Sequence, residues 1–181
     1  MTEAPDTAAW QGISIGDYDG DGNLDIFISE PAFQGGGIAP TSDKLFKGKG
    51  DGTWQYVTPT TGIITSRDYG ECSFFVDYDN DGKIDIFVKN IPNNSTDTTT
   101  RNRLYHNNGD GTFTQVDNAG GLADAEHGIV EGTICSFIDY DNDGYMDVIF
   151  GGNDASEALY HNNRDGTFTD VTTAVGLVPA A

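Results

Sequence analysis

Three short segments of the chain are rich in aspartate and follow one pattern. They read DYDGDGNLD from residue 17, DYDNDGKID from residue 77 and DYDNDGYMD from residue 139. In D-x-D-x-D-G-x-x-D, the carboxylates at positions 1, 3 and 5 converge as the loop curls, glycine at position 6 permits the turn, and position 7 offers a backbone carbonyl. Ca²⁺ prefers a ligand set of this kind, made of oxygen atoms alone, so each segment is predicted to bind one calcium ion.

The predicted ligands are the four aspartates of each segment and the carbonyl oxygen of its seventh residue. They are Asp17, Asp19, Asp21, Asn23 and Asp25; Asp77, Asp79, Asp81, Lys83 and Asp85; and Asp139, Asp141, Asp143, Tyr145 and Asp147. Mg²⁺ fits worse because it requires a tight octahedron and keeps its waters. Zinc fits poorly because the segments have no nearby histidine or cysteine ligand. An EF-hand would need a glutamate at position 12 and flanking helices, whereas here the ninth residue runs directly into apolar residues.

The aspartate segments belong to a longer repeat. Their first residues are 60 and 62 positions apart, and each is followed by a second repeated element: LFKGKGDGTWQYV from residue 45, LYHNNGDGTFTQV from 104 and LYHNNRDGTFTDV from 159. The chain therefore divides into units 1–63, 64–122 and 123–181, a period typical of propellers or solenoids. Each unit contains four short apolar runs and an Asp-Gly turn, which predicts an all-β fold of three four-stranded antiparallel blades.

Composition narrows the classes of partner. The chain carries 29 acidic and 9 basic residues, a formal net charge of −20. Nucleic acid and anionic membrane surfaces are disfavoured as partners, because both select for lysine and arginine, whereas cations are favoured. No apolar run is long enough for a membrane helix, and the first residues show no signal peptide.

The two cysteines, Cys72 and Cys135, are too few for a disulfide framework. They lie five and four residues before their aspartate segments, which places them on opposite faces of their strands. We therefore expect two buried thiols with no bridge between them.

The pairing of DYDNDGKIDIFV with LYHNNGDGTFTQV and a trailing GL resembles the FG-GAP/VCBS repeat of integrin-α-type β-propellers, over almost the whole chain. The resemblance implies four-stranded blades, calcium in the loop between the first two strands, and an extracellular or cell-surface location. No unit carries a clear Phe-Gly or Gly-Ala-Pro signature, the nearest being GGGIAP at 35–40, so the bacterial and marine VCBS-like members are closer than the integrins.

Three blades are fewer than the 4–8 typical of propellers. An open stack would expose an apolar face at each end, and such faces mark association sites. We expect a homo-oligomer in which two chains close head-to-tail into a six-bladed ring. The alternative is an excised or designed piece of a longer propeller.

No catalytic pattern emerges. His106 and His161 occupy the same repeat position, which favours a structural role, and His127 stands alone in a connection. Non-repeated segments at 29–43, 63–71, 89–103 and 121–132 are the better places for ligand contacts, and the resemblance puts them opposite the calcium loops. Their candidate residues are Phe33, Arg67, Tyr69, Arg101, Arg103 and His127. The sequence thus favours a calcium-binding, non-enzymatic module for adhesion or ligand recognition of a protein or carbohydrate; a lectin-like propeller and a scaffold with no ligand beyond the metal remain alternatives.

Overall fold

The computed structural model describes residues 12–29, 43–63, 70–90, 101–123, 134–151 and 157–177. These residues form three antiparallel sheets of four strands each, in simple meander order. The first sheet holds β1 (Gly12–Gly16), β2 (Asp25–Ser29), β3 (Lys44–Gly48) and β4 (Trp54–Tyr56). The second holds β5 (Gly70–Val76), β6 (Asp85–Asn90), β7 (Arg103–Asn107) and β8 (Phe113–Gln115), and the third holds β9 (Ile134–Ile138), β10 (Asp147–Gly151), β11 (Ala158–Asn162) and β12 (Phe168–Asp170). The predicted all-β architecture of three four-stranded blades is confirmed.

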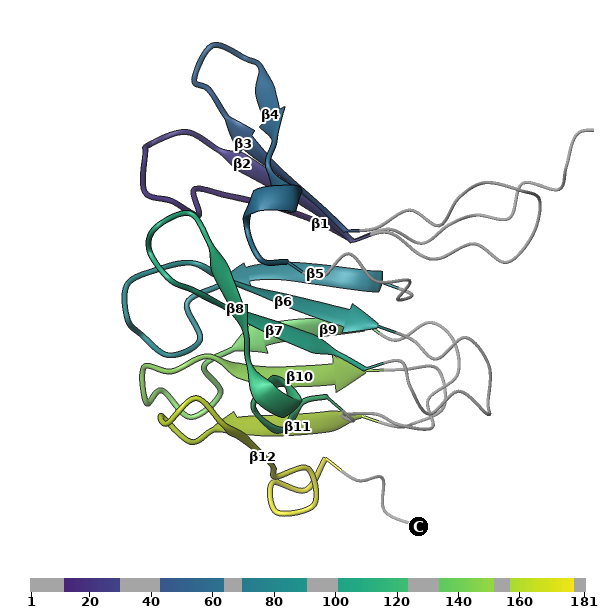
Figure 1. Ribbon diagram of the computed structural model, residues 1–181. Helices are drawn as coiled ribbons and strands as arrows, with labels where there is room; N and C mark the ends of the chain where they lie inside the picture. The colour runs from purple at the N-terminus through teal and green to yellow at the C-terminus, as the bar shows by residue number, and fades with distance from the viewer. Residues whose placement is uncertain are drawn as a thin grey trace, which may run out of the picture.

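The sheets stack face to face, with the second between the other two (Figure 1). Two apolar layers fill the spaces between them. The layer between the first and second sheets includes Phe27, Leu45, Ile86, Val88 and Tyr105. The layer between the second and third sheets includes Phe87, Leu104, Val148, Phe150 and Phe168. Aromatic and branched side chains dominate both layers, as expected for packed sheet faces.

Strand β6 shows why the second strand of each unit is a continuous apolar run. All six of its residues are buried, because Ile86 and Val88 face the first sheet while Phe87 faces the third. Successive side chains of a strand point to opposite faces, so only a strand covered on both sides needs apolar residues at every position.

The outer faces of the first and third sheets are apolar but exposed. On the first sheet these side chains include Ile13, Ile15, Trp54 and Tyr56, and on the third they include Ile134 and Ile138. No described residue of the chain covers them.

Short turns after the fourth strand tie each of the first two sheets to the next one. η1 (Thr58–Thr60) follows β4, and the carbonyl of Thr61 then accepts a 2.7 Å hydrogen bond from the N–H of Phe113 in β8. η2 (Asp117–Gly121) follows β8 and brings Gly121 against the backbone of Phe168 in β12. A Cβ at Gly121 would stand 2.8 Å from the Phe168 carbonyl, so glycine permits this approach. The TTGI and AGGL sequences are therefore joints between sheets.

The two cysteines depart from expectation. Cys72 in β5 and Cys135 in β9 are half-buried, and their Sγ atoms lie 2.6 Å apart. The two side chains do lie on opposite faces of their respective sheets. Because the second and third sheets are stacked, however, these two faces are the ones that pack against each other. No disulfide joins the two residues in the described part of the chain, as expected, but the thiols are half-buried rather than buried, and the argument from opposite faces that kept them apart is wrong.

No helix among the described residues has the length and apolarity needed to cross a membrane.

Candidate metal centre

Each aspartate segment forms the hairpin loop between the first two strands of a sheet. The loops lie between β1 and β2, between β5 and β6, and between β9 and β10, and all three occupy the same edge of the stack (Figure 1). The register of each hairpin pairs the residue before the loop with the ninth residue of the pattern, for example Gly16 with Asp25 and Val76 with Asp85. The antiparallel pairing therefore closes the loop at both ends.

The first aspartate of each loop holds the curl. In the second loop the Asp77 carboxylate accepts hydrogen bonds from the N–H groups of Asp81 at 3.1 Å and Gly82 at 3.0 Å. Asp17 and Asp139 do the same in their loops. Gly82 has φ +84° and open space around its Cα, so this position requires glycine for its backbone angle.

The ninth aspartate joins the loop to the third strand of its sheet. Asp85 is fully buried, and its two oxygens accept hydrogen bonds from the N–H groups of Tyr78 and Asn107. Asp25 and Asp147 are equally buried and bonded in the same way. These hydrogen bonds leave lone pairs on the carboxylate oxygens.

The carboxylates converge in every loop. Oxygens of Asp77, Asp79 and Asp81 lie within 4.8 Å of one another, as do those of Asp139, Asp141 and Asp143. In the first loop the converging group is Asp17, Asp19 and Asp25. The seventh residues, Asn23, Lys83 and Tyr145, each donate a backbone N–H to the fifth aspartate.

The electrostatics of the second loop fit a cation. Burial, together with the charges of Asp79 and Asp81, raises the pKa of Asp85 to about 7. The Asp81 carboxylate hydrogen-bonds the Lys83 ammonium, which lowers the pKa of Asp81. A buried carboxylate among other carboxylates is costly to ionise, and a bound cation removes that cost. In the first loop, Asp19 Oδ1 is buried with no hydrogen-bond partner among the described residues, as expected of an oxygen that a cation would satisfy.

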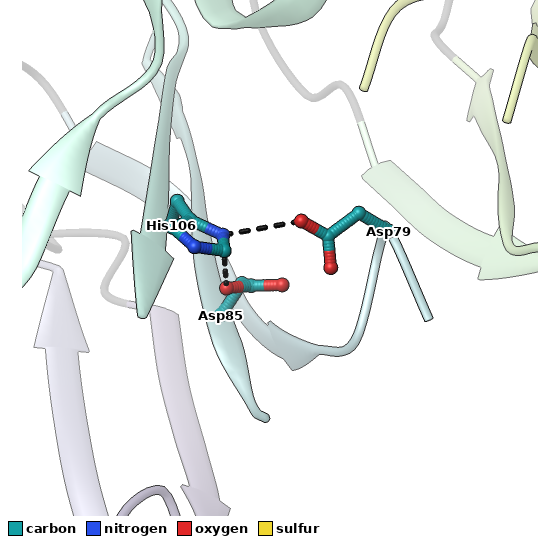
Figure 2. A group of neighbouring side chains, drawn as sticks. All are labelled: Asp79, Asp85 and His106. Carbon is teal, nitrogen blue, oxygen red and sulfur yellow. Dashed lines mark ion pairs between the residues drawn. The ribbon is translucent and has the colours of Figure 1, made fainter. Parts of the chain in front are cut away.

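Histidines approach two of the three loops. His106 Nδ1 lies 3.1 Å from Asp79 and 3.5 Å from the buried Asp85 (Figure 2). His161 Nδ1 lies 3.2 Å from Asp147 and 3.6 Å from Asp141. The argument that zinc lacks nearby histidine is therefore wrong: the nitrogen comes from the third strand of the sheet, 21 residues after Asp85 in one unit and 14 residues after Asp147 in the other.

Strand pairing explains this proximity. β6 and β7 pair Ile86 with Tyr105, so one residue further along Asp85 stands opposite His106. The equivalent residue in the first sheet is Lys47, whose Nζ contacts Asp19 and lies 2.9 Å from Asp21. Lysine in place of histidine is the signal that makes the first loop different, and it is visible in the aligned repeats.

The structure brings no ligand site together from the described residues among the other candidates for ligand contact. Arg103 hydrogen-bonds Gln115 of the neighbouring strand at 3.2 Å, and Arg101 provides a backbone carbonyl to Asn90. Phe33, Arg67, Tyr69 and His127, with most of the four non-repeated segments, lie outside the described residues.

The fold and its loops define a repeat module of the β-propeller type, in which every sheet carries the same acidic loop. The FG-GAP-like repeat model matches residues 35–88, 93–150 and 139–180, and the FG-GAP repeat model matches residues 9–42. The chain belongs to the FG-GAP repeat family. The match at 35–88 takes the last two strands of the first sheet with the first two of the second, so the family's repeat straddles two sheets. No curated protein matches the chain.

Proposed function

We propose that this protein is a calcium-stabilised, non-enzymatic module for adhesion or ligand recognition, with one Ca²⁺ held by each acidic loop. The observation that carries the proposal is the threefold recurrence of a loop whose carboxylates converge within 4.8 Å. Without a cation these carboxylates repel one another, so binding and folding are coupled. The proposed ligands are the aspartates at positions 1, 3, 5 and 9 with the carbonyl at position 7.

Calcium is favoured over zinc by the count of ligand types. Each loop offers four carboxylates, whereas a histidine of the third strand lies beside only two of the three loops. Carboxylate and carbonyl oxygens suit Ca²⁺, while structural zinc sites favour cysteine and histidine. The histidines act in this proposal as neighbours of the loop rather than as required ligands.

A thermal melt with Ca²⁺ and with EDTA tests the proposal. Because Ca²⁺ binds only the folded loops, we expect a higher Tm with Ca²⁺, by an amount that grows with its concentration. Isothermal titration should show that Asp79→Asn removes one bound ion. Asp110→Asn is the matched control, since it removes one exposed carboxylate outside the loops. A Tm that does not respond to chelation would contradict the calcium proposal.

The same titration separates calcium from zinc. His106→Asn removes the nitrogen beside Asp79 and Asp85. For a calcium loop we expect this variant to keep its bound ion. Loss of the ion on this substitution, together with tighter binding of Zn²⁺ than of Ca²⁺, would instead indicate a zinc site.

Adhesion or ligand recognition rests on the family, since FG-GAP repeats are typical of extracellular and cell-surface proteins. A lectin-like carbohydrate site is the second candidate for the recognition role. A glycan array probed with the calcium-loaded protein distinguishes the two, because a lectin-like module binds defined glycans and loses them in EDTA.

A further inference from the structure

Two cysteines far apart in sequence meet between the second and third sheets. Cys72 in β5 and Cys135 in β9 are 63 residues apart, and their Sγ atoms approach to 2.6 Å. Non-bonded carbon atoms settle about 3.5 to 4.0 Å apart, and sulfur is larger than carbon. A disulfide bond measures about 2.05 Å. The two sulfur atoms are therefore closer than two separate thiols would rest.

The surrounding packing fixes this approach. Phe74 and Phe137 lie two residues beyond the cysteines on the same strands, and their rings pack edge to face with centroids 5.6 Å apart. Both rings belong to the apolar layer between the second and third sheets. The neighbouring contact thus holds β5 and β9 in the register that brings the sulfurs together.

A local irregularity of β5 accompanies the contact. The pairing of β5 with β6 shifts between Gly70 and Cys72, and after the shift Cys72 stands opposite Lys89. A bulge of this kind re-aims the side chains that follow it. On β6, Lys89 is buried and forms a 2.7 Å ion pair with Glu71, so the residue just before Cys72 is anchored to the neighbouring strand.

We propose that Cys72 and Cys135 form a disulfide that covalently joins the second and third sheets. Both residues are half-buried, which leaves an oxidant access to the pair. The chemistry is exchange with an organic disulfide. One cysteine thiolate attacks a sulfur of that reagent and expels one thiol, and the second cysteine then attacks the resulting mixed disulfide and expels the other. The protein loses two protons and two electrons, and the reagent is reduced to two thiols.

The disulfide stabilises the stack by constraining the unfolded chain. A link across 63 residues closes a long loop, and long loops lose the most entropy when they are closed. It also adds a covalent link to a joint that side-chain packing, the η2 turn and the hydrogen bond from Asn162 to the Tyr78 carbonyl already hold. The proposal does not depend on calcium, because neither cysteine lies in an acidic loop.

The test compares the wild-type chain after treatment with oxidised glutathione and after treatment with a phosphine reductant, each in Ca²⁺ and in EDTA. After oxidation we expect no thiol to be alkylated in denaturant, a monomer on a non-reducing gel, and one linked peptide pair containing both cysteines. The Tm should exceed that of the reduced protein by roughly 5 to 15 °C. Since the reduced wild type is its own control, folding of a variant is not at issue.

Single substitutions sharpen the result. Cys72→Ser and Cys135→Ser each remove one partner, so the Tm of either variant should no longer respond to oxidation. Two alkylated thiols in the oxidised wild type, or chains linked to one another, would overturn the proposal. An intramolecular disulfide without any gain in Tm would overturn its stabilising role.

Discussion

The ninth aspartate of each loop is the residue on which the site is built. Asp25, Asp85 and Asp147 are fully buried, and each accepts one N–H from its own loop and one from the third strand of its sheet. A buried carboxylate with two backbone donors is held in one orientation. The loop is thus preorganised by its last residue, while the other aspartates remain more accessible to an ion.

The residue opposite this aspartate differs between the loops. In the first sheet it is Lys47, whose ammonium group contacts Asp19 and Asp21. Both contacts raise the pKa of Lys47, so this side chain stays charged. An ammonium group among the carboxylates neutralises the charge that attracts Ca²⁺. The other two loops each carry a cation on the fifth aspartate alone, Lys83 on Asp81 and Arg164 on Asp143, whereas Lys47 pairs with two aspartates of its loop. We therefore expect the first loop to bind Ca²⁺ more weakly than the other two.

Lys47→Met should strengthen calcium binding by the first loop. The change removes the competing charge and keeps an apolar stem of similar length. We expect affinity at that loop to rise by about tenfold, equivalent to about 1.4 kcal/mol, and titration calorimetry would then show three sites of similar strength. Lys49→Met is the control, since it makes the same charge change at an exposed position in the turn between β3 and β4. Equal effects of the two variants would mean that only net charge matters.

At the scale of strands and turns, the repeats made most of the fold predictable. The four strands of each unit, the acidic hairpin and the Asp-Gly turn recur three times in the sequence, and the structure has each of them. A short run such as KLFK or ALYH is ambiguous by itself. Because such runs occupy the same place in all three units, they could be assigned to strands.

Two expectations from the sequence were wrong, that no histidine lies near the acidic loops and that the two cysteines stay apart, and both errors have one physical cause. The pairing of His106 with Asp85 and the meeting of Cys72 with Cys135 both depend on what a residue faces. Alternation along a strand tells which side of its own sheet a side chain occupies. It does not tell which residue stands across from it in the next strand or the next sheet. Aligning the repeats on the strand register would have placed the histidines, whereas the cysteine contact needed the stacking order of the sheets.

One asparagine in each later unit links the sheets through the backbone. Asn107 is buried in β7, and its Nδ2 donates to the carbonyl of Tyr18 in the first loop and to that of Ile84, both at 2.8 Å. Asn162 makes the equivalent bonds to Tyr78 and Met146. The side chain therefore couples the acidic loop of one sheet to the third strand of the next.

Asn107→Ala should destabilise the fold by about 1 to 3 kcal/mol, because it leaves the carbonyls of Tyr18 and Ile84, one buried and one part-buried, without their donor. Chemical denaturation at fixed Ca²⁺ measures the change. Asn108→Ala serves as the comparison: Asn108 is the next residue, is exposed, and its side chain hydrogen-bonds Thr112 and Thr114 of its own hairpin, so its loss should cost within about 0.5 kcal/mol. Similar costs for both would show that the link between sheets contributes nothing of its own.

At the scale of the whole molecule, the outer faces of the first and third sheets expose large apolar side chains. Ile15 on the first sheet is 62% exposed and Ile134 on the third is 75% exposed. Ile15, Ile26, Phe46 and Tyr56 form one continuous row across the first sheet, as the strand pairing shows. In the third unit, Val175 and Leu177 are also exposed. They follow the fourth strand, β12, as η1 follows β4 and η2 follows β8 in the first two sheets. We propose that the third sheet of one chain packs on the first sheet of another.

This joint would be weaker than the two internal ones. In the first sheet the position of Asn107 and Asn162 is taken by Gly48, where a Cβ would stand 2.3 Å from the Leu24 carbonyl. Glycine cannot supply the amide that links successive sheets, so a head-to-tail joint would rest on apolar burial. We therefore expect association that depends on concentration rather than a permanent dimer.

Light scattering over a concentration series in Ca²⁺ tests this closure. We expect the mass to rise from 19.4 kDa towards twice that value and to stop there, because two stacks of three blades close a six-bladed ring. Ile15→Lys buries a charge in the joint and should hold the chain at the monomer mass. Gln55→Lys adds the same charge on β4, pointing away from the face that carries Tyr56, and should leave association intact. A wild-type chain that stays monomeric throughout would rule out closure by a second copy, and growth beyond two copies would indicate an open filament instead.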